Sequence, residues 1–201
     1  MKLYFFPGAC SLAAHIALYY TELPFTAVKV NPRTKQTETG EDFTALNPKG
    51  YVPALALDNG EVLTELAAVL HYIADQKPTA KLLPAAGSMA HYHALAWLNY
   101  VATEVHKNFA PLFDKTAGDE ARQAATTKLK ARFDWLSEVL EGRDYLQDEL
   151  SVADFYLYTV LNWPHFISMD MTPWPVLQEY VTKLAKLDAV QQARRAEKLP
   201  G

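Results

Sequence analysis

The chain has 201 residues and changes character near residue 78, which limits its fold more than any other feature of the sequence. Strand and helix patterns alternate before this point, whereas only helical patterns follow it. The stretch between the two patterns holds two prolines and one glycine, which interrupt regular structure. We therefore predict an α+β domain at residues 1–77, a linker at 78–87 and an all-helical domain at 88–201.

The predicted order in the first domain is strand, helix, strand, short helix, hairpin and helix. A strand–helix–strand beginning predicts a parallel pair, and the hairpin signal Asp58-Asn59-Gly60 adds antiparallel strands. Short apolar runs bounded by turn residues indicate the strands, and apolar positions at helical spacing indicate the helices. The predicted strands are Lys2–Phe6, Thr26–Val30, Val52–Leu57 and Glu61–Thr64, and the predicted helices are Ser11–Glu22, Glu41–Leu46 and Glu65–Asp75.

The second domain is predicted to contain helices alone. Ser151 and Asp154 stand three residues apart in a capping-box pattern, which predicts a helix start that serves folding and not catalysis. The predicted helices are Ser88–Lys115, Asp119–Leu140, Ser151–Trp163, Thr172–Lys186 and Ala189–Glu197.

Charge and cysteine content exclude several classes of function. With 19 basic and 23 acidic side chains the net charge is -4, which does not fit a nucleic-acid-binding surface. A single cysteine excludes an internal disulfide and a cysteine-built zinc site, and the histidines lack ligand spacing, so we expect no metal. The first apolar stretch is too short to cross a bilayer. We expect a soluble, cytoplasmic protein that binds neither nucleic acid nor membrane.

Cys10 is the most informative single residue, because it follows a predicted strand and begins a predicted helix. A thiol at a helix N-terminus faces unpaired N–H groups and the positive end of the helix dipole, which predicts a lowered pKa. A free cysteine is also one of the residues most often buried and inert. Because position 13 is Ala13, no internal dithiol cycle is possible.

Two prolines lie close to the strand that begins at Val52. Neither proline has an N–H that could donate a hydrogen bond to the sheet. A cis Val52-Pro53 bond at the strand entrance would free the Val52 backbone to pair with an extended peptide outside the sheet. A plain proline-rich turn explains the same residues. At the next helix start, Thr64 can cap the helix and Glu65 suits its first turn, although Glu65 could also bind a ligand ammonium.

Asn99, Thr103 and His106 stand at positions i, i+4 and i+7 of the long predicted helix, so they share one face. A polar stripe of this kind is more often solvated than functional, and the spacing alone does not decide between the two.

Taken together, the motifs resemble a cytosolic glutathione transferase, and most closely the bacterial beta class. The resemblance covers essentially the whole chain, and it is specific because the motifs occur together in this order. They are Pro7-Gly8-Ala9-Cys10-Ser11, Asn47-Pro48-Lys49-Gly50 followed by Val52-Pro53-Ala54-Leu55, Thr64-Glu65, Trp97-Leu98-Asn99-Tyr100, Glu104-Val105-His106-Lys107 and Ser151-Val152-Ala153-Asp154.

The resemblance implies a thioredoxin-like first domain, a helical second domain, a homodimer and glutathione as co-substrate, with small apolar electrophiles bound between the domains. It implies that Cys10 lies beside the glutathione sulfur and that His106 lies close to it. The implied roles of the remaining residues concern the tripeptide: Val52 pairs with its cysteinyl part beside a cis Pro53, Glu65 and the Leu66 backbone hold its γ-glutamyl end, Lys35 reaches its glycyl carboxylate, and Asn99 and Glu104 reach it from the partner subunit.

Two positions depart from the pattern of the class. Tyr51 stands where Gln is usual among the glutathione-binding residues, so one polar contact is lost or replaced. Leu66 stands where Gly or Ser is usual, which keeps a backbone contact and removes a hydroxyl contact.

Three functions remain open from the sequence. The first is conjugation of glutathione to apolar electrophiles, with Cys10 and His106 acting on the sulfur. The second is thiol–disulfide exchange through a mixed disulfide at Cys10. The third is a binding or regulatory partner that keeps the fold without turnover. Cys10 and Glu65 argue against the third, because a scaffold without activity needs neither.

Overall fold

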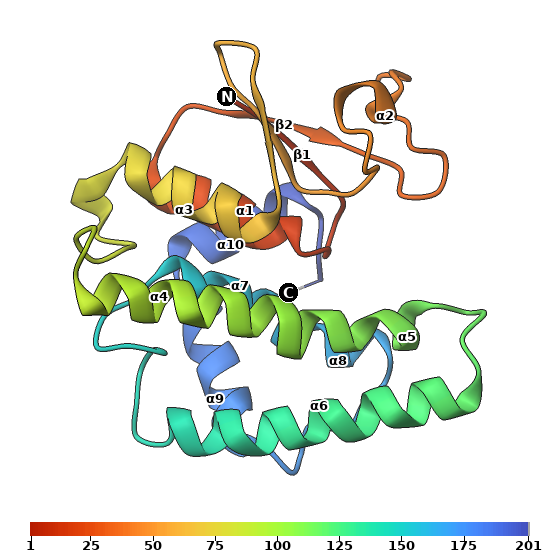
Figure 1. Ribbon diagram of the computed structural model, residues 1–201, viewed down its shortest axis with the longest axis vertical. Coiled ribbons are helices and arrows are strands. Elements are labelled where there is room, and N and C mark those ends of the chain that lie inside the picture. The colour runs from red at the N-terminus through yellow and green to blue at the C-terminus, as the bar shows by residue number, and fades with distance from the viewer. Residues whose placement is uncertain (201) are drawn as a thin grey trace. The chain divides into compact units, whose positions relative to one another are not determined.

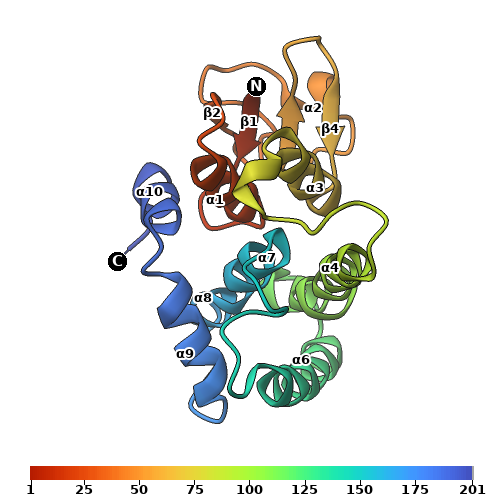
Figure 2. The same cartoon turned by 90° about the vertical axis from the view of Figure 1, so that its left-hand side faces the viewer.

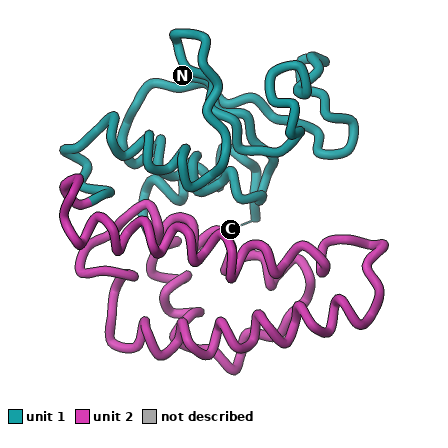
Figure 3. Tube along the Cα trace, viewed as in Figure 1, with its two compact units in different colours: residues 1–83, 186–201 teal, residues 84–185 magenta. Residues whose placement is uncertain are grey.

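The computed structural model describes residues 1–200 and divides into two compact units (Figure 3). Unit 1 combines residues 1–83 with the chain from residue 186 onward, and unit 2 comprises residues 84–185. The division falls inside the expected linker. The C-terminal segment differs from our expectation, because we placed it in the helical domain and its contacts group it with unit 1.

Unit 1 is built on a four-stranded sheet with the strand order β2-β1-β3-β4. Figure 1 labels β1 and β2 of this sheet. β1 and β2 are parallel, and β3 is antiparallel to both β1 and β4, so the expected parallel pair and hairpin are confirmed. The elements are β1 (Lys2–Phe5), α1 (Ser11–Thr21), β2 (Thr26–Lys29), α2 (Phe43–Leu46), β3 (Ala54–Ala56), β4 (Val62–Thr64), α3 (Leu66–Gln76), a 3₁₀ turn (Pro78–Ala80) and α10 (Asp188–Ala196).

Alternation along the strands divides the core of unit 1 between two faces of the sheet. Tyr4 and Ala54 point toward α2, where the Phe43 ring lies 5.5 Å from that of Tyr4. Leu3 and Leu55 lie on the other face and are fully buried. α1 and α3 lie side by side on that second face in Figures 1 and 2.

The C-terminal segment joins unit 1 through a buried carboxylate. α10 packs against α1, and Glu197 just after α10 is only 3% exposed. Glu197 Oε2 accepts a hydrogen bond from Gly8 N–H at 2.9 Å, and Oε1 lies 3.0 Å from Nδ1 of the fully buried His15. The His15 ring stacks on Tyr19, with centroids 5.2 Å apart. One side chain therefore connects the end of the chain to the loop before α1.

Unit 2 is helical, as expected. Every residue of its helix α7 is buried, and the expected capping box is present, since Ser151 N–H donates to Asp154 Oδ2 at 2.8 Å. The helices are α4 (Met89–Tyr100), α5 (Ala110–Phe113), α6 (Asp119–Leu140), α7 (Val152–Leu161), α8 (Trp163–Phe166) and α9 (Pro175–Leu184).

The long helix expected at Ser88–Lys115 is interrupted. A π-helical turn at Val101–Val105 and a 3₁₀ turn at His106–Phe109 separate α4 from α5. Pro111 has no N–H to donate to the Lys107 carbonyl, and the N–H of Ala110 bonds to that carbonyl instead. The face expected from regular helical spacing is therefore wrong beyond Tyr100, because a π turn changes the rotation per residue.

Within residues 1–200, none of the helices combines the length and the apolar character needed to cross a membrane.

The buried carboxylate of Glu197 makes a prediction for stability. We expect Glu197→Ala to lower the free energy of unfolding by about 3 kcal/mol or more, because it removes the carboxylate that accepts from Gly8 N–H and contacts the buried His15. Glu197→Gln should cost less, since its amide oxygen still accepts from Gly8. Urea denaturation followed by circular dichroism measures both variants.

Glu138→Ala is the matched control, because Glu138 is exposed on α6 and its removal should change stability by less than about 0.5 kcal/mol. A Glu197→Ala variant as stable as this control would contradict the role given to Glu197.

Candidate functional site

Cys10 occupies the N-cap position of α1, where the chain leaves β1 through Pro7 and Gly8. Its side chain is half-buried, and its thiol donates a hydrogen bond to the Val52 carbonyl, with Sγ and O 3.4 Å apart. Val52 precedes β3 and is joined to Pro53 by a cis peptide bond, as expected. The structure therefore brings Cys10 and the Val52 backbone together.

The pKa expected for Cys10 is wrong in its direction. Burial of the thiol raises its pKa from 9.0 to about 12, although the backbone N–H groups of Ser11 and Cys10 act to lower it. The negative charges of Glu65 and Glu197 raise it further. Loss of solvation therefore exceeds the effect of the helix N-terminus at this position, and the thiol keeps its proton near pH 7.

Glu65 stands at the N-cap of α3 with φ of 70°, in a backbone region that non-glycine residues rarely adopt. Its carboxylate pairs with Lys49, whose Nζ lies 2.6 Å from Oε1, and the same ammonium donates to Thr64 Oγ1 at 2.8 Å. The expected capping by Thr64 is wrong, because the helix starts one residue later and no side chain caps it. The side chain of Glu65 is 71% exposed, so its carboxylate is accessible from solvent although it contacts Lys49.

Leu66 is the first residue of α3, and its side chain is buried in unit 1. The first N–H groups of a helix have no partner within the helix, so the N-terminus of α3 offers donors to a carboxylate. Unit 1 thus places a carboxylate on Glu65 next to free backbone donors.

Lys35 and Tyr51 contact each other in unit 1. Lys35 Nζ donates to the Gly50 carbonyl at 2.9 Å and lies 5.4 Å from the centre of the Tyr51 ring. The Tyr51 side chain is 72% exposed. An ammonium is therefore held at the surface by two successive residues.

In unit 2, His106 begins the 3₁₀ turn that follows the π turn. Its Nδ1 and the hydroxyl of Tyr156 share a hydrogen bond of 2.6 Å, and its ring meets that of Trp163 edge to face at 4.7 Å. Burial, helped by the charge of Lys107, lowers the pKa of His106 from 6.5 to about 4. The ring is therefore neutral near pH 7, and Nε2 is the nitrogen that can act on a reactant.

Asn99 and Glu104 each bond to a different neighbour in unit 2. Asn99 Nδ2 donates to the Leu95 carbonyl at 2.9 Å. Arg132 on α6 donates to Glu104 Oε2 through Nε at 2.9 Å and through Nη2 at 2.6 Å. The Arg132 contact orients the Glu104 carboxylate and leaves its second oxygen for another donor.

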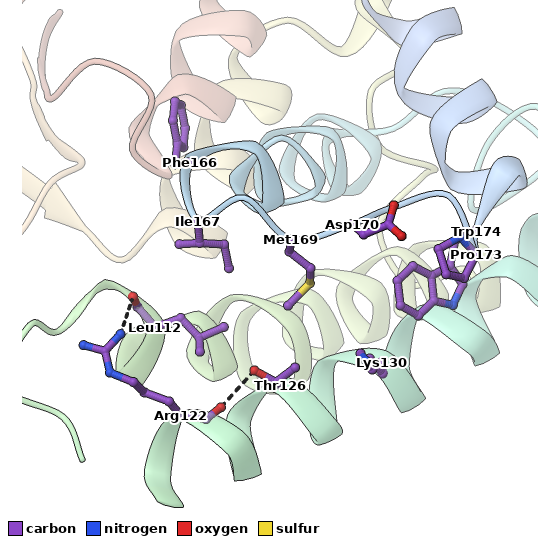
Figure 4. A pocket seen from close by; sticks show the side chains of 10 residues that line it. All are labelled: Leu112, Arg122, Thr126, Lys130, Phe166, Ile167, Met169, Asp170, Pro173 and Trp174. Atoms are coloured by element: carbon purple, nitrogen blue, oxygen red, sulfur yellow. Dashed lines mark hydrogen bonds between the residues drawn. The ribbon is translucent and has the colours of Figure 1, made fainter. Parts of the chain in front are cut away.

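Unit 2 also contains a pocket of about 550 Å³ (Figure 4). The Arg122 guanidinium at its edge donates to the carbonyls of Leu112, Asp114 and Ala117, so this cation holds the loop after α5 together. The residues singled out in the sequence do not line this pocket. Its lining comes from α5, α6, the end of α8 and the segment that follows α8: Leu112, Arg122, Thr126, Lys130, Phe166, Ile167, Met169, Asp170, Pro173 and Trp174.

Among residues 1–200, no three His, Cys, Asp or Glu side chains are grouped so that they could hold a metal ion.

Sequence reasoning missed the partners of the site residues. Lys49 stood in a recognised motif, but nothing in its neighbourhood indicated the pair with Glu65. Tyr156 and Arg132 are 50 and 28 residues from the side chains they contact, which is beyond the reach of local patterns.

Comparison with known proteins identifies the family. Residues 8–76 match the model of the glutathione S-transferase N-terminal domain, and residues 88–188 match that of the C-terminal domain. The glutathione S-transferase GstA of Escherichia coli O157:H7 is 38% identical, covering 99% of this chain and 100% of the relative.

Solved structures agree with this result. A sphingomonad glutathione S-transferase complexed with glutathione is 48% identical, with a TM-score of 0.96 and full coverage of both chains. The beta-class glutathione S-transferase of Sphingomonas chungbukensis is 46% identical, with a TM-score of 0.97 and full coverage of both chains. The expected thioredoxin-like first domain and helical second domain are confirmed. With both domain models matched and such identity along almost the whole chain, this protein belongs to the glutathione S-transferase family, and its resemblance to the bacterial beta class is confirmed.

Proposed function

We propose that this glutathione transferase joins the thiol of glutathione, its co-substrate, to small apolar electrophiles. The observation that carries the proposal is the contact between the Cys10 thiol and the Val52 backbone, in a unit that also offers groups complementary to glutathione. The family relationship supports this function and does not support a binding partner without turnover.

The polar groups of unit 1 fit the chemistry of glutathione, which carries two carboxylates, one ammonium and one thiol. Lys35 is a cation suited to the glycyl carboxylate, and Glu65 is a carboxylate suited to the ammonium. The N–H of Leu66 at the start of α3 suits the γ-glutamyl carboxylate. Val52, outside the β3 ladder, has a backbone suited to the cysteinyl amide.

Cys10 acts in this proposal as a hydrogen-bond donor. Glutathione supplies the thiol, which loses its proton to water; the resulting thiolate sulfur becomes bonded to the electrophilic carbon while the leaving group departs with its bonding electrons. Because its pKa is raised to about 12, Cys10 stays protonated near pH 7 and can donate to a negatively charged sulfur. Thiol–disulfide exchange needs the Cys10 thiolate, which this environment disfavours.

His106 acts as a neutral imidazole. The hydrogen bond with Tyr156 occupies Nδ1 and fixes the orientation of the ring, so that Nε2 is available to the reaction. The role of His106 at the glutathione sulfur stays a prediction.

We propose that a second copy of this chain covers an aromatic surface on α4 and α6. Trp97 and Tyr100 on α4 contact the ring of Trp135 on α6, with centroids 5.5 and 4.8 Å from it, and Trp135 is 42% exposed. Met89 and Tyr92 on α4 are exposed as well. An aromatic surface of this kind favours self-association. Contacts of Asn99 and Glu104 with the glutathione of the partner subunit stay predictions.

A cytoplasmic location also belongs to this proposal, because a reaction that consumes reduced glutathione and a chain with one free cysteine suit a reducing compartment.

The central test compares two reactions in the same variants. We expect the purified protein to conjugate glutathione to an aromatic halide, and Cys10→Ala to lower kcat/KM by about fivefold, because one hydrogen-bond donor is lost. Cys10→Ser should retain most of the activity, since its hydroxyl can donate in the same place. Reduction of a small disulfide is measured in parallel. If the protein carries out thiol–disulfide exchange through Cys10, both Cys10→Ala and Cys10→Ser should lose this second activity.

If the unaltered protein neither binds immobilised glutathione nor turns over either substrate, the proposed function is wrong. If Cys10→Ser abolishes conjugation as completely as Cys10→Ala while the fold is retained, the role of Cys10 as a hydrogen-bond donor is wrong.

The neutral state of His106 can be measured directly. The ring proton signals of His106 should titrate with a midpoint near pH 4 instead of 6.5, because burial disfavours the cation. The conjugation rate should then show no inflection from His106 as the pH rises through 6.5. His106→Asn identifies the signal by its loss, and a midpoint near 6.5 would show that the ring is solvated.

Trp135 tests the proposed dimer. We expect Trp135→Glu to convert a dimer to a monomer in sedimentation velocity, because a charge cannot be desolvated without a partner on an aromatic surface. Helix content measured by circular dichroism should not change. Lys115→Glu is the control, as it alters an exposed charge after α5, and a Trp135→Glu variant that sediments like this control would contradict the proposed surface.

A further inference from the structure

Tyr51 has no role in packing the core that would explain an aromatic ring at its position. The side chain is 72% exposed, and the Tyr51 carbonyl accepts a hydrogen bond from Asn47 Nδ2 at 2.8 Å. That hydrogen bond fixes the position of the Tyr51 backbone and does not involve the Tyr51 ring. The contact that the ring does make is with the ammonium of Lys35, 5.4 Å from its centre.

Lys35 is held along its whole length. Its N–H donates to the Asn31 carbonyl at 2.9 Å, and its carbonyl accepts from the N–H of Phe43 at 2.8 Å. The aliphatic stem runs beside Gly50, where an added Cβ would lie 3.5 Å from Lys35 Cε. The ammonium then ends between the Gly50 carbonyl, 2.9 Å away, and the Tyr51 ring.

These contacts leave most of the hydrogen-bonding capacity of Lys35 unused. An ammonium carries three N–H donors, and the Gly50 carbonyl accepts from one of them. A ring face attracts a cation without accepting a conventional hydrogen bond, so two donors remain for an anion. An unrestrained lysine would lose considerable side-chain freedom on binding the same anion.

We propose that Tyr51 is a positioning residue, whose ring holds the Lys35 ammonium in place to receive the glycyl carboxylate of glutathione. The inference rests on the proposed binding of glutathione in unit 1. Tyr51 contributes to binding through Lys35. Its hydroxyl makes no contact with the tripeptide in this proposal, and its ring face is the part that matters.

Glutathione binding measured by isothermal titration calorimetry separates the ring from the hydroxyl. We expect Tyr51→Leu to raise the Kd for glutathione about two- to fivefold, because the cation–π contact is lost. Tyr51→Phe keeps the ring face and should bind like the unaltered protein. In conjugation assays the same change should appear in KM for glutathione and leave kcat unaltered.

Glutathione amide, in which the glycyl carboxylate is replaced by a neutral carboxamide, shows whether Tyr51 acts through Lys35. Its Kd should be equal for the unaltered protein and Tyr51→Leu, since the carboxylate that Lys35 receives is absent. In a Lys35→Met background, Tyr51→Leu should cause no further loss of affinity for glutathione. Tyr20→Leu, a change at another exposed tyrosine of unit 1, is the matched control.

A readout without any ligand completes the design. The Tyr51 ring should shift the ε-methylene proton resonances of Lys35 upfield, and Tyr51→Leu should remove this shift while Tyr51→Phe retains it. The proposal is overturned if Tyr51→Phe binds as weakly as Tyr51→Leu, if the loss persists with glutathione amide, or if the methylene resonances do not respond. Failure of the unaltered protein to bind glutathione would instead refute the proposed function, and this outcome is visible before any variant is made.

Discussion

The buried carboxylate of Glu197 is the interaction on which the arrangement of unit 1 depends. A carboxylate removed from water is tolerated only where donors replace its hydration, and here Gly8 N–H and His15 do so at 2.9 and 3.0 Å. Gly8 lies two residues before Cys10, so the last helix of the chain holds the loop that delivers the thiol. The same negative charge contributes to the raised pKa of Cys10. Stability and reactivity of unit 1 are therefore linked through one side chain.

Two opposing effects meet at Cys10, and their relative size decides its chemistry. The N-terminus of α1 offers N–H groups that stabilise the thiolate. The loss of hydration by the half-buried side chain destabilises the thiolate by more than these N–H groups stabilise it. The Val52 carbonyl accepts from the thiol and so favours the protonated form as well. A cysteine in this state is a poor nucleophile and a usable donor. The position of a cysteine at a helix start therefore does not predict the reactivity of its thiol unless the burial of that thiol is also known.

Local patterns predicted the fold well, because its elements are short and bounded by strong turn residues. The order of the elements along the chain, the parallel pair and the Asp58–Gly60 hairpin follow from strand, helix and turn signals in the first 76 residues, whereas the pairing of β1 with β3 was not predicted. The π turn at Val101–Val105 was missed because its sequence has ordinary helical character. Likewise, the site residues could be named from motifs, while their partners could not. The pair between Glu104 and Arg132 joins two helices, and it depends on how they pack and on no pattern in either one.

Lys49, Glu65 and Lys35 each have a partner within unit 1, and the strength of these contacts decides whether binding of glutathione requires rearrangement. Lys49 and Glu65 are 51% and 71% exposed, and exposed pairs of this kind contribute at most about 1 kcal/mol. Lys49 approaches only one oxygen of Glu65, so an incoming ammonium can use the other without displacing it. The Lys35 ammonium likewise donates one N–H to the Gly50 carbonyl and has two N–H groups left for a ligand. Each group is thus oriented by a weak partner that need not leave, which lowers the ordering cost of binding.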